Sequence, residues 1–106
     1  MKALDIRDLV HFSEDEPRRR TLIEGERLWS EVVCLQGAQG IGPLRDEDSD
    51  GLLVVLAGSV AAQVGKGRAR MKQWETLEVP SGLDLTVRNA SEEPAVLLLV
   101  VAPPPR

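Results

Sequence analysis

Two short runs of uninterrupted apolar residues limit most strongly how this chain folds. They are residues 52–57 (LLVVLA) and 95–101 (AVLLLVV). Both are far too short to cross a membrane. A strand that carries no polar residue must be covered on both of its faces. The chain therefore has to supply a core on one side of each run and a cover on the other.

The chain after residue 17 has the turn pattern of an all-β protein, with short apolar segments separated by Gly, Pro, Asn and Asp. Gly25 and residues 65–67 (GKG) mark tight hairpins, because glycine accepts the positive φ that such turns need. Residues 36–43 are predicted to be a loop or bulged edge. Closely spaced strands without a long helix indicate a sandwich or barrel. We predict strands at residues 19–24, 27–35, 52–57, 59–65, 67–72, 76–79, 84–88 and 95–102.

The chain is predicted to divide into an N-terminal arm, residues 1–17, and one barrel domain, residues 18–106. Within the arm, residues 4–10 can form one or two helical turns, and Pro17 is expected to end them. A chain of 106 residues has room for a single core. The arm can cover part of the outer face of the apolar strands, and a second copy can cover the rest. We therefore expect a homodimer.

Composition excludes several functions. The chain has 13 basic and 17 acidic residues and a net charge of −4, with two Trp, one Phe and no Tyr. An acidic surface with few aromatic side chains argues against a nucleic-acid partner. One His and one Cys cannot form a Cys/His zinc site in a monomer. No signal-peptide or membrane-spanning stretch is evident, so the expected location is the cytoplasm, with no membrane partner.

Two segments resemble the signatures of the cupin family. Residues 51–58 (GLLVVLAG) resemble the end of the first signature, and residues 74–89 (WETLEVPSGLDLTVRN) resemble the second. The most specific part is the PSG at residues 80–82, followed by Asn89. The second segment opens with Trp74, where the family has a turn glycine. The similarity covers roughly residues 27–102. It implies a small single-domain cupin, a double-stranded β-helix or jelly-roll-like barrel of two antiparallel sheets that is often dimeric.

The resemblance also locates the positions at which cupin enzymes hold a metal, and the metal ligands are missing there. The family Glu falls on Gly51 and the second-signature His on Leu85. The His-X-His pair falls on Leu44 and Asp46 if four residues separate it from Gly51. Three separating residues would place the pair on residues 45 and 47 (Arg and Glu). We prefer the first register. At most one oxygen donor remains, so we predict no metal and no cofactor.

The interior that replaces this metal site is expected to be apolar. Alternate residues of a strand share a face. The inward-facing residues within 44–46, 51–55 and 85–87 should therefore line one interior. Such an interior has no group for proton transfer, and in so small a barrel we expect it to pack shut. The other outcome is a pocket for a small apolar ligand. The predicted lining residues are Leu44, Asp46, Gly51, Leu53, Val55, Leu85 and Val87.

Residues 46–51 (DEDSDG) match the first half of a helix-flanked calcium loop. Its twelfth position, which needs a Glu, is Ala57, and the following residues form a predicted strand. We reject that motif and retain only a weak alternative, a cation loop at Asp46, Asp48 and Asp50. The preferred interpretation is a solvated acidic loop at the mouth of the barrel.

The remaining candidate residues have simpler structural explanations. His11 has no predicted catalytic partner, and Cys34 ends an apolar strand as a buried small residue. The run at residues 18–20 (RRR) could bind an anion or an acidic partner, but a solvated edge next to acidic residues is the preferred interpretation. Trp29 and Trp74 suit an interface, the mouth of a cavity or the core.

These observations favour a metal-free, non-catalytic cupin-fold protein that acts as a small-molecule-binding, regulatory or structural module. An enzyme is the less favoured alternative. It would be a metal-dependent dioxygenase or isomerase with a rebuilt site that uses Asp46, Glu47, Asp48 or His11. A cofactor-free epimerase ranks last, because cupin epimerases use a His–Tyr pair and this chain has no Tyr.

Overall fold

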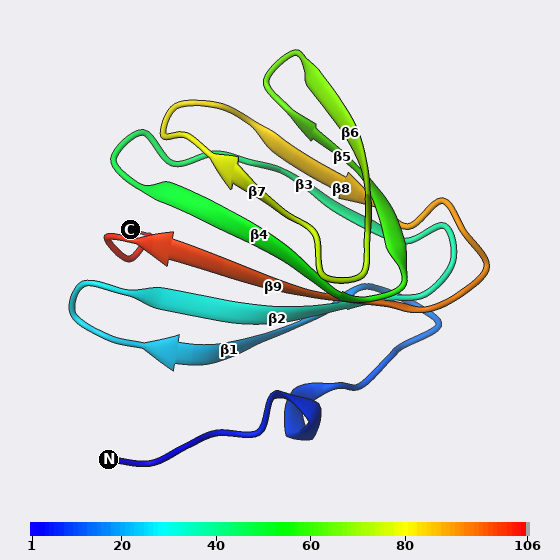
Figure 1. Cartoon of the computed structure of the whole chain (residues 1–106), viewed down its shortest axis with the longest axis horizontal. Helices are drawn as coiled ribbons and strands as arrows, with labels where there is room; N and C mark the ends of the chain where they lie inside the picture. The colour runs from blue at the N-terminus through cyan, green and yellow to red at the C-terminus, as the bar shows by residue number, and fades with distance from the viewer. Residues whose placement is uncertain (106) are drawn as a thin grey trace.

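The computed structural model describes residues 1–105 (Figure 1). A single 3₁₀ turn, η1 (Ile6–Leu9), precedes nine strands. The strands are β1 (Arg18–Glu24), β2 (Trp29–Leu35), β3 (Gly40–Leu44), β4 (Asp50–Ala57), β5 (Ser59–Val64), β6 (Gly67–Lys72), β7 (Thr76–Val79), β8 (Leu85–Arg88) and β9 (Ala95–Ala102). No helix among these residues is long and apolar enough to span a bilayer.

The strands form two antiparallel sheets, as predicted. The larger sheet has the order β1-β2-β9-β4-β7, and the smaller has the order β3-β8-β5-β6. The two sheets approach each other at one end of the molecule and spread apart at the other, where the β1–β2, β3–β4 and β7–β8 connections lie (Figure 1). The predicted strand positions are confirmed to within about two residues, with one strand in addition to those predicted.

The strand absent from the predicted list is β3, in the segment for which we expected a loop or a bulged edge; the bulged edge is confirmed, because β3 is an edge strand of the smaller sheet. It pairs with β8 through Gly40, Ile41 and Leu44, with a shift in register between the last two. A Cβ atom at Gly40 would lie 2.7 Å from the Val87 carbonyl oxygen, and one at Gly42 would clash with the carbonyl oxygen of Leu85. The glycines are therefore needed for close approach of two strands, not for a turn.

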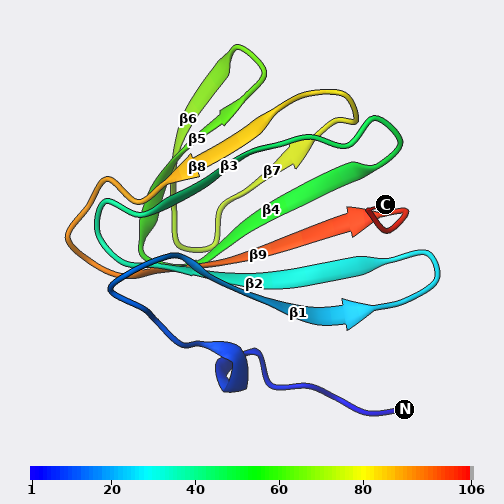
Figure 2. The same ribbon diagram turned by 180° about the vertical axis from the view of Figure 1, so that it is seen from behind.

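The arm also differs from expectation in one respect. The helical turn ends at Leu9, well before Pro17, and Val10 already has an extended backbone. Both views place η1 on the outer side of the larger sheet, beside β1 and β2 (Figures 1 and 2). There Leu9, Phe12 and their arm neighbours Ile6 and Val10 pack on a cluster of buried residues, namely Val32, Cys34 and Val96.

The arm covers only one end of this outer face. Farther along the same face, Leu52 is 41% exposed, and Val54, Leu98 and Val100 are only half-buried. Leu52 pairs with Val100, and Val54 pairs with Leu98, so the four side chains form one continuous strip across β4 and β9. The inner faces of both strands lie in the core. One part of the predicted cover is thus present, and an apolar strip is left at the surface.

Asn89 joins the end of β8 to the connection that leads into β9. Its side chain is fully buried. Its Nδ2 donates to the carbonyl oxygens of Leu35 at 3.1 Å and Glu93 at 2.7 Å, and its Oδ1 accepts from the Ser91 amide and hydroxyl. Asn89 therefore provides hydrogen-bond partners for backbone groups of β2 and of the 89–94 connection that no neighbouring strand pairs.

Trp74 has a backbone conformation that favours glycine. It lies in the turn between β6 and β7 with φ of 76°, and its side chain is 73% exposed. The turn is held by hydrogen bonds from the Trp74 amide to the Val55 carbonyl and from the Glu75 amide to the Lys72 carbonyl. The exposed indole contradicts a core position for this residue.

We predict that Trp74→Gly stabilises the protein. A bulky residue at positive φ costs roughly 1 kcal/mol or more, and an exposed ring gains little from packing. The expected result is a rise of about 1 kcal/mol in the free energy of unfolding, measured by urea denaturation. The control Trp74→Ala keeps the backbone strain and should give no comparable gain; equal stability of the two variants would contradict the explanation.

Candidate functional site

The spread end of the barrel contains a cavity of about 210 Å³. The β3–β4 and β7–β8 connections border it, together with the first residue of β2 and the C-terminal tail, at the left of Figure 1. The side chains that line it divide into an apolar floor and a polar rim. They are Arg19, Trp29, Leu44, Arg45, Asp46, Ser49, Asp50, Gly51, Val79, Pro80, Leu83, Leu85, Leu99, Val101 and Pro105.

A glycine in β4 contributes to the space above the floor. Gly51 pairs with Val79 of β7 on one side and Val101 of β9 on the other. A Cβ atom there would lie only 3.3 Å from the Cβ of Val79. Leu85 closes the cavity from the opposite sheet and is 2% exposed. The floor can therefore contact the apolar body of a ligand but offers it no charged group.

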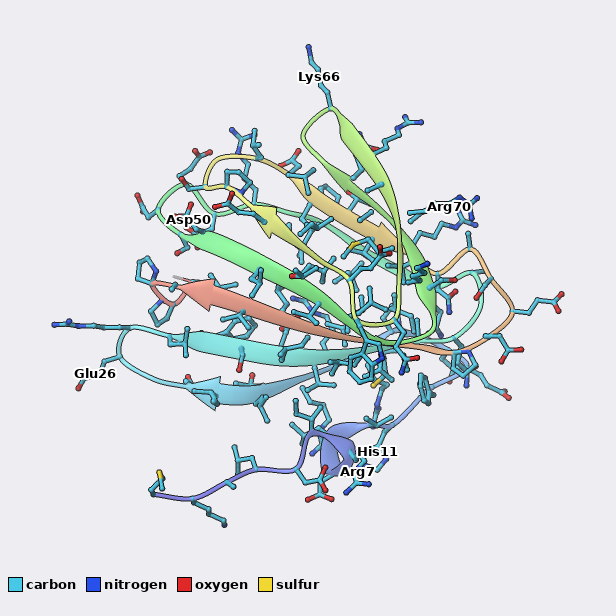
Figure 3. The ribbon with its side chains drawn as sticks, viewed as in Figure 1. Arg7, His11, Glu26, Asp50, Lys66 and Arg70 are labelled. Carbon is cyan, nitrogen blue, oxygen red and sulfur yellow. The ribbon has the colours of Figure 1, made fainter. Side chains whose placement is uncertain are left out.

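The acidic β3–β4 loop forms one side of the rim and is held in place by its own polar groups. Asp50 Oδ1 accepts from the Ser81 amide at 3.0 Å, and the Gly82 amide donates to the Asp46 carbonyl at 2.9 Å. Ser49 Oγ donates to the Pro103 carbonyl at 2.6 Å. Figure 3 shows Asp50 at this end of the molecule. The loop is thus tied to the β7–β8 turn and to the C-terminal tail.

Arg45 adds a cation to the same rim. Its Nε lies 2.7 Å from Glu47 Oε1, and its Nη1 lies 3.8 Å from Asp84 Oδ1. All three side chains are half exposed or more, so each pair adds little to stability. With Glu47 and Asp84 beside Arg45, carboxylates outnumber guanidinium groups around this mouth, so its charge does not favour an anion.

A buried ion pair lies between the rim and the core. Glu31 is 4% exposed and, like Val33 and Leu35, sits on the inner face of β2. Its Oε1 accepts from Arg19 Nε at 2.8 Å and lies 2.7 Å from Arg19 Nη2. Arg19 is also part of the cavity wall. A buried carboxylate needs such a partner, because an unpaired charge inside the protein is costly.

This ion pair was not predicted, although the sequence contains a signal for it. The preferred interpretation of residues 18–20 is a solvated basic edge, yet alternation along β1 places Arg19 on the opposite face from its two arginine neighbours. Alternation along β2 puts Glu31 on the same face as Val33. A lone acidic residue on an otherwise apolar face predicts a basic partner on the adjacent strand.

The structure brings four of the seven predicted lining residues to the cavity. These are Leu44, Asp46, Gly51 and Leu85. The other three, Leu53, Val55 and Val87, are fully buried in the core and are not part of its wall. The interior is thus closed in the middle of the barrel and hollow at its mouth.

The four residues at the cavity are also the positions where the resemblance places metal ligands in the preferred register. Of these side chains only that of Asp46 carries a donor atom, and its Oδ1 accepts from the Asp48 amide at 2.8 Å. Within residues 1–105, no group of three His, Cys, Asp or Glu side chains is arranged to hold a metal ion. The three carboxylates of the weak alternative, Asp46, Asp48 and Asp50, are not arranged as such a group either. The residues present do not fit the metal of cupin enzymes.

His11 and Cys34 lie away from the cavity, where the arm meets the larger sheet. Figure 3 shows His11 beside the helical turn, far from Asp50. Burial raises the pKa of the Cys34 thiol, and a hydrogen bond from the His11 backbone partly offsets this. A thiol with a raised pKa is a poor nucleophile at neutral pH. Cys34 is therefore a packing residue.

Comparisons with known proteins give a consistent fold assignment. A cupin-domain sequence family matches residues 31–101. TT1209 from Thermus thermophilus is similar over 99% of this chain and 100% of its own, with 28% identity and a TM-score of 0.94. An uncharacterised Klebsiella pneumoniae protein with a double-stranded β-helix domain is 21% identical, over 97% and 90% of the chains, with a TM-score of 0.89. KdgF from a Halomonas species is 13% identical, over 89% and 84%, with a TM-score of 0.78. No curated protein sequence matches the chain.

Proposed function

This chain belongs to the cupin family, and we propose that it is a non-catalytic, metal-free member that binds a small ligand in the cavity at the mouth of its barrel. The observation that carries the proposal is the replacement of the family's metal ligands. Leu44, Gly51 and Leu85 occupy three of the four positions, and all three line the cavity. An apolar, partly open space therefore lies where cupin enzymes hold a metal.

The size and lining of the cavity suit a ligand with a small apolar body. A dry protein cavity of roughly 150 Å³ is known to hold benzene. At about 210 Å³ this cavity takes a molecule somewhat larger than that. Trp29 at the rim offers an aromatic face, and the exposed Asp50 offers a carboxylate near solvent. A small molecule with an apolar body and one polar end matches this arrangement.

Thermal unfolding in the presence of small aromatic probes tests the proposal. Benzene, indole and phenol are added to the wild-type protein and to Leu44→Trp, which fills the cavity. A ligand present at 100 times its dissociation constant stabilises the native state by about 2.7 kcal/mol, a shift of several degrees. We expect a shift with at least one probe in the wild type and none in Leu44→Trp. Leu4→Trp, in the exposed N-terminal arm and outside both the cavity and the apolar strip, is the matched control and should keep the shift.

Two results would contradict this function. A flat unfolding midpoint with every probe would indicate that the cavity does not bind apolar ligands. A clear rise with Mn²⁺, Fe²⁺, Ni²⁺ or Zn²⁺ relative to EDTA would support the alternative, a metal-dependent enzyme with a rebuilt site. In that case Asp46 and Glu47 are the first residues to replace.

We further propose that the protein is a homodimer that covers the apolar strip on β4 and β9. The strip consists of Leu52, Val54, Leu98 and Val100. A sheet face of this kind can pair with its own copy about a two-fold axis. Light scattering at micromolar concentration should give twice the chain mass of 11.6 kDa. The Leu52→Asp variant should give a monomer, and a monomeric wild type would contradict the proposal.

A further inference from the structure

The smaller sheet is unusual in its charge. Its four strands contain four of the 13 basic residues of the chain and none of the 17 acidic residues. The four are Arg68, Arg70, Lys72 and Arg88, and all are exposed. We call the surface that they form the basic face. The chain as a whole has a net charge of −4, so this positive surface is confined to one side of an acidic protein.

Strand register places these side chains side by side on the outer surface. Ala61 of β5 pairs with Arg88 on β8 and with Arg70 on β6, so the two guanidinium groups flank a small side chain in one cross-strand row. In the next row, Gln63 pairs with Arg68 and with Thr86. A shallow groove lies over Ala61, bordered by the β6 side chains on one side and the β8 side chains on the other. Figure 3 shows Arg70 pointing away from the barrel.

The basic face is also unpaired. Among residues 1–105, none of its four cations lies within ion-pair distance of a carboxylate, whereas Arg7, Arg19 and Arg45 each do. Arg70 and Arg88 lie on either side of β5 in one row, and like charges placed this close repel one another. An anionic partner would relieve this repulsion and gain charge-assisted hydrogen bonds, which Arg forms with carboxylates in a bidentate geometry.

We propose that the basic face binds a short, extended acidic segment of a partner protein. Residues 68, 70 and 72 of β6 follow one another at about 7 Å, which is the spacing of alternate side chains in any extended strand. Carboxylates at every second position of a bound segment therefore match the three cations. Ala61, with its small side chain, leaves room for the backbone of the segment.

The exposure of the cations favours a segment over a small anion. A single exposed ion pair is worth at most about 1 kcal/mol, so useful affinity requires several contacts at once. A nucleic acid fits less well. The four strands carry no aromatic residue for stacking, and Glu75 and Glu92 line the hollows that adjoin the basic face. A long polyanion would meet these carboxylates beyond the sheet.

Fluorescence anisotropy with a defined peptide tests this proposal. The probe is a fluorescein-labelled hexapeptide of alternating Glu and Thr, whose three carboxylates match the three cations of β6, titrated with the full chain at low salt and at roughly physiological salt. We expect saturable binding at low salt that weakens at higher salt, and no binding of the same peptide with Gln in place of Glu. Arg70→Glu and Arg88→Glu should each weaken binding roughly tenfold or more, because each both removes an attractive charge and adds a repulsive one.

Arg27→Glu is the matched control, because Arg27 is exposed in the β1–β2 hairpin and the substitution changes the net charge equally. It should leave the dissociation constant nearly unchanged. Equal weakening by Arg27→Glu and Arg70→Glu, absence of saturable binding, or stronger binding of a single-stranded DNA of the same length would each overturn the proposal. Unfolding curves verify that the variants fold. The basic face and the cavity are separate, so failure here leaves the proposed ligand site intact.

Discussion

Asn89→Ala is expected to lower the free energy of unfolding by about 3 kcal/mol. The substitution removes two donated and two accepted hydrogen bonds of a fully buried side chain. It also leaves the Leu35 and Glu93 carbonyl oxygens without that donor, and each unsatisfied buried group costs about 1–3 kcal/mol. For a domain of this size the midpoint of thermal unfolding should fall by roughly 15 °C.

Asn89→Asp distinguishes the hydrogen bonds that this side chain accepts from those that it donates. It keeps the oxygen that accepts from Ser91 but replaces the Nδ2 donor with an oxygen that faces two carbonyls. We expect it to be no more stable than Asn89→Ala. Calorimetry or denaturant unfolding measures all three proteins. Wild-type stability of Asn89→Ala would show that the 89–94 connection finds other partners and that Asn89 does not hold it.

Arg19→Met is expected to lower the free energy of unfolding by about 2–3 kcal/mol at neutral pH. Removing one member of a buried ion pair leaves the other charge unpaired, which typically costs about 3–5 kcal/mol. We use a smaller value because the Arg19 side chain is 39% exposed, although that of Glu31 is only 6% exposed. Methionine retains most of the apolar stem, so lost packing contributes little.

The neighbouring substitution Arg18→Met is the matched control, since Arg18 is exposed and makes no ion pair among the described residues. It should change stability by less than about 0.5 kcal/mol. The double variant Arg19→Met/Glu31→Met, which removes both charges, should recover much of the loss. Equal effects of Arg18→Met and Arg19→Met on denaturant midpoints would contradict a structural role for the pair.

Most of the fold could be predicted because its signals are local. The apolar runs that form β4 and β9, and the hairpin glycines at residues 25 and 65–67, each point to a strand or turn from their own composition. The composition of the β3 segment does not distinguish a loop from a bulged edge strand. Its glycines are required by the backbone of β8, which is far away in sequence, and the same residue type also favours turns.

The candidate site was predictable only where it reuses positions of the cupin barrel. Leu44, Asp46, Gly51 and Leu85 were located by their places in the two signatures. The depth of the hollow was not predictable, because it depends on how far the two sheets separate at the mouth. The link between Arg19 and Glu31 depends on strand register, which a single sequence does not specify across a hairpin with a bulge.

The position of β9 has a consequence for how the protein is made. The last strand of the chain lies in the middle of the larger sheet, between β2 and β4, which do not pair with each other. During synthesis the larger sheet therefore cannot form completely until residues 95–102 have been made. Until then the apolar segment of β4 has no partner on that edge, and exposed apolar strands aggregate. A chain that stops near residue 94 should accumulate as aggregate and not as half of a barrel, and the intact chain should fold slowly because its main contacts are distant in sequence.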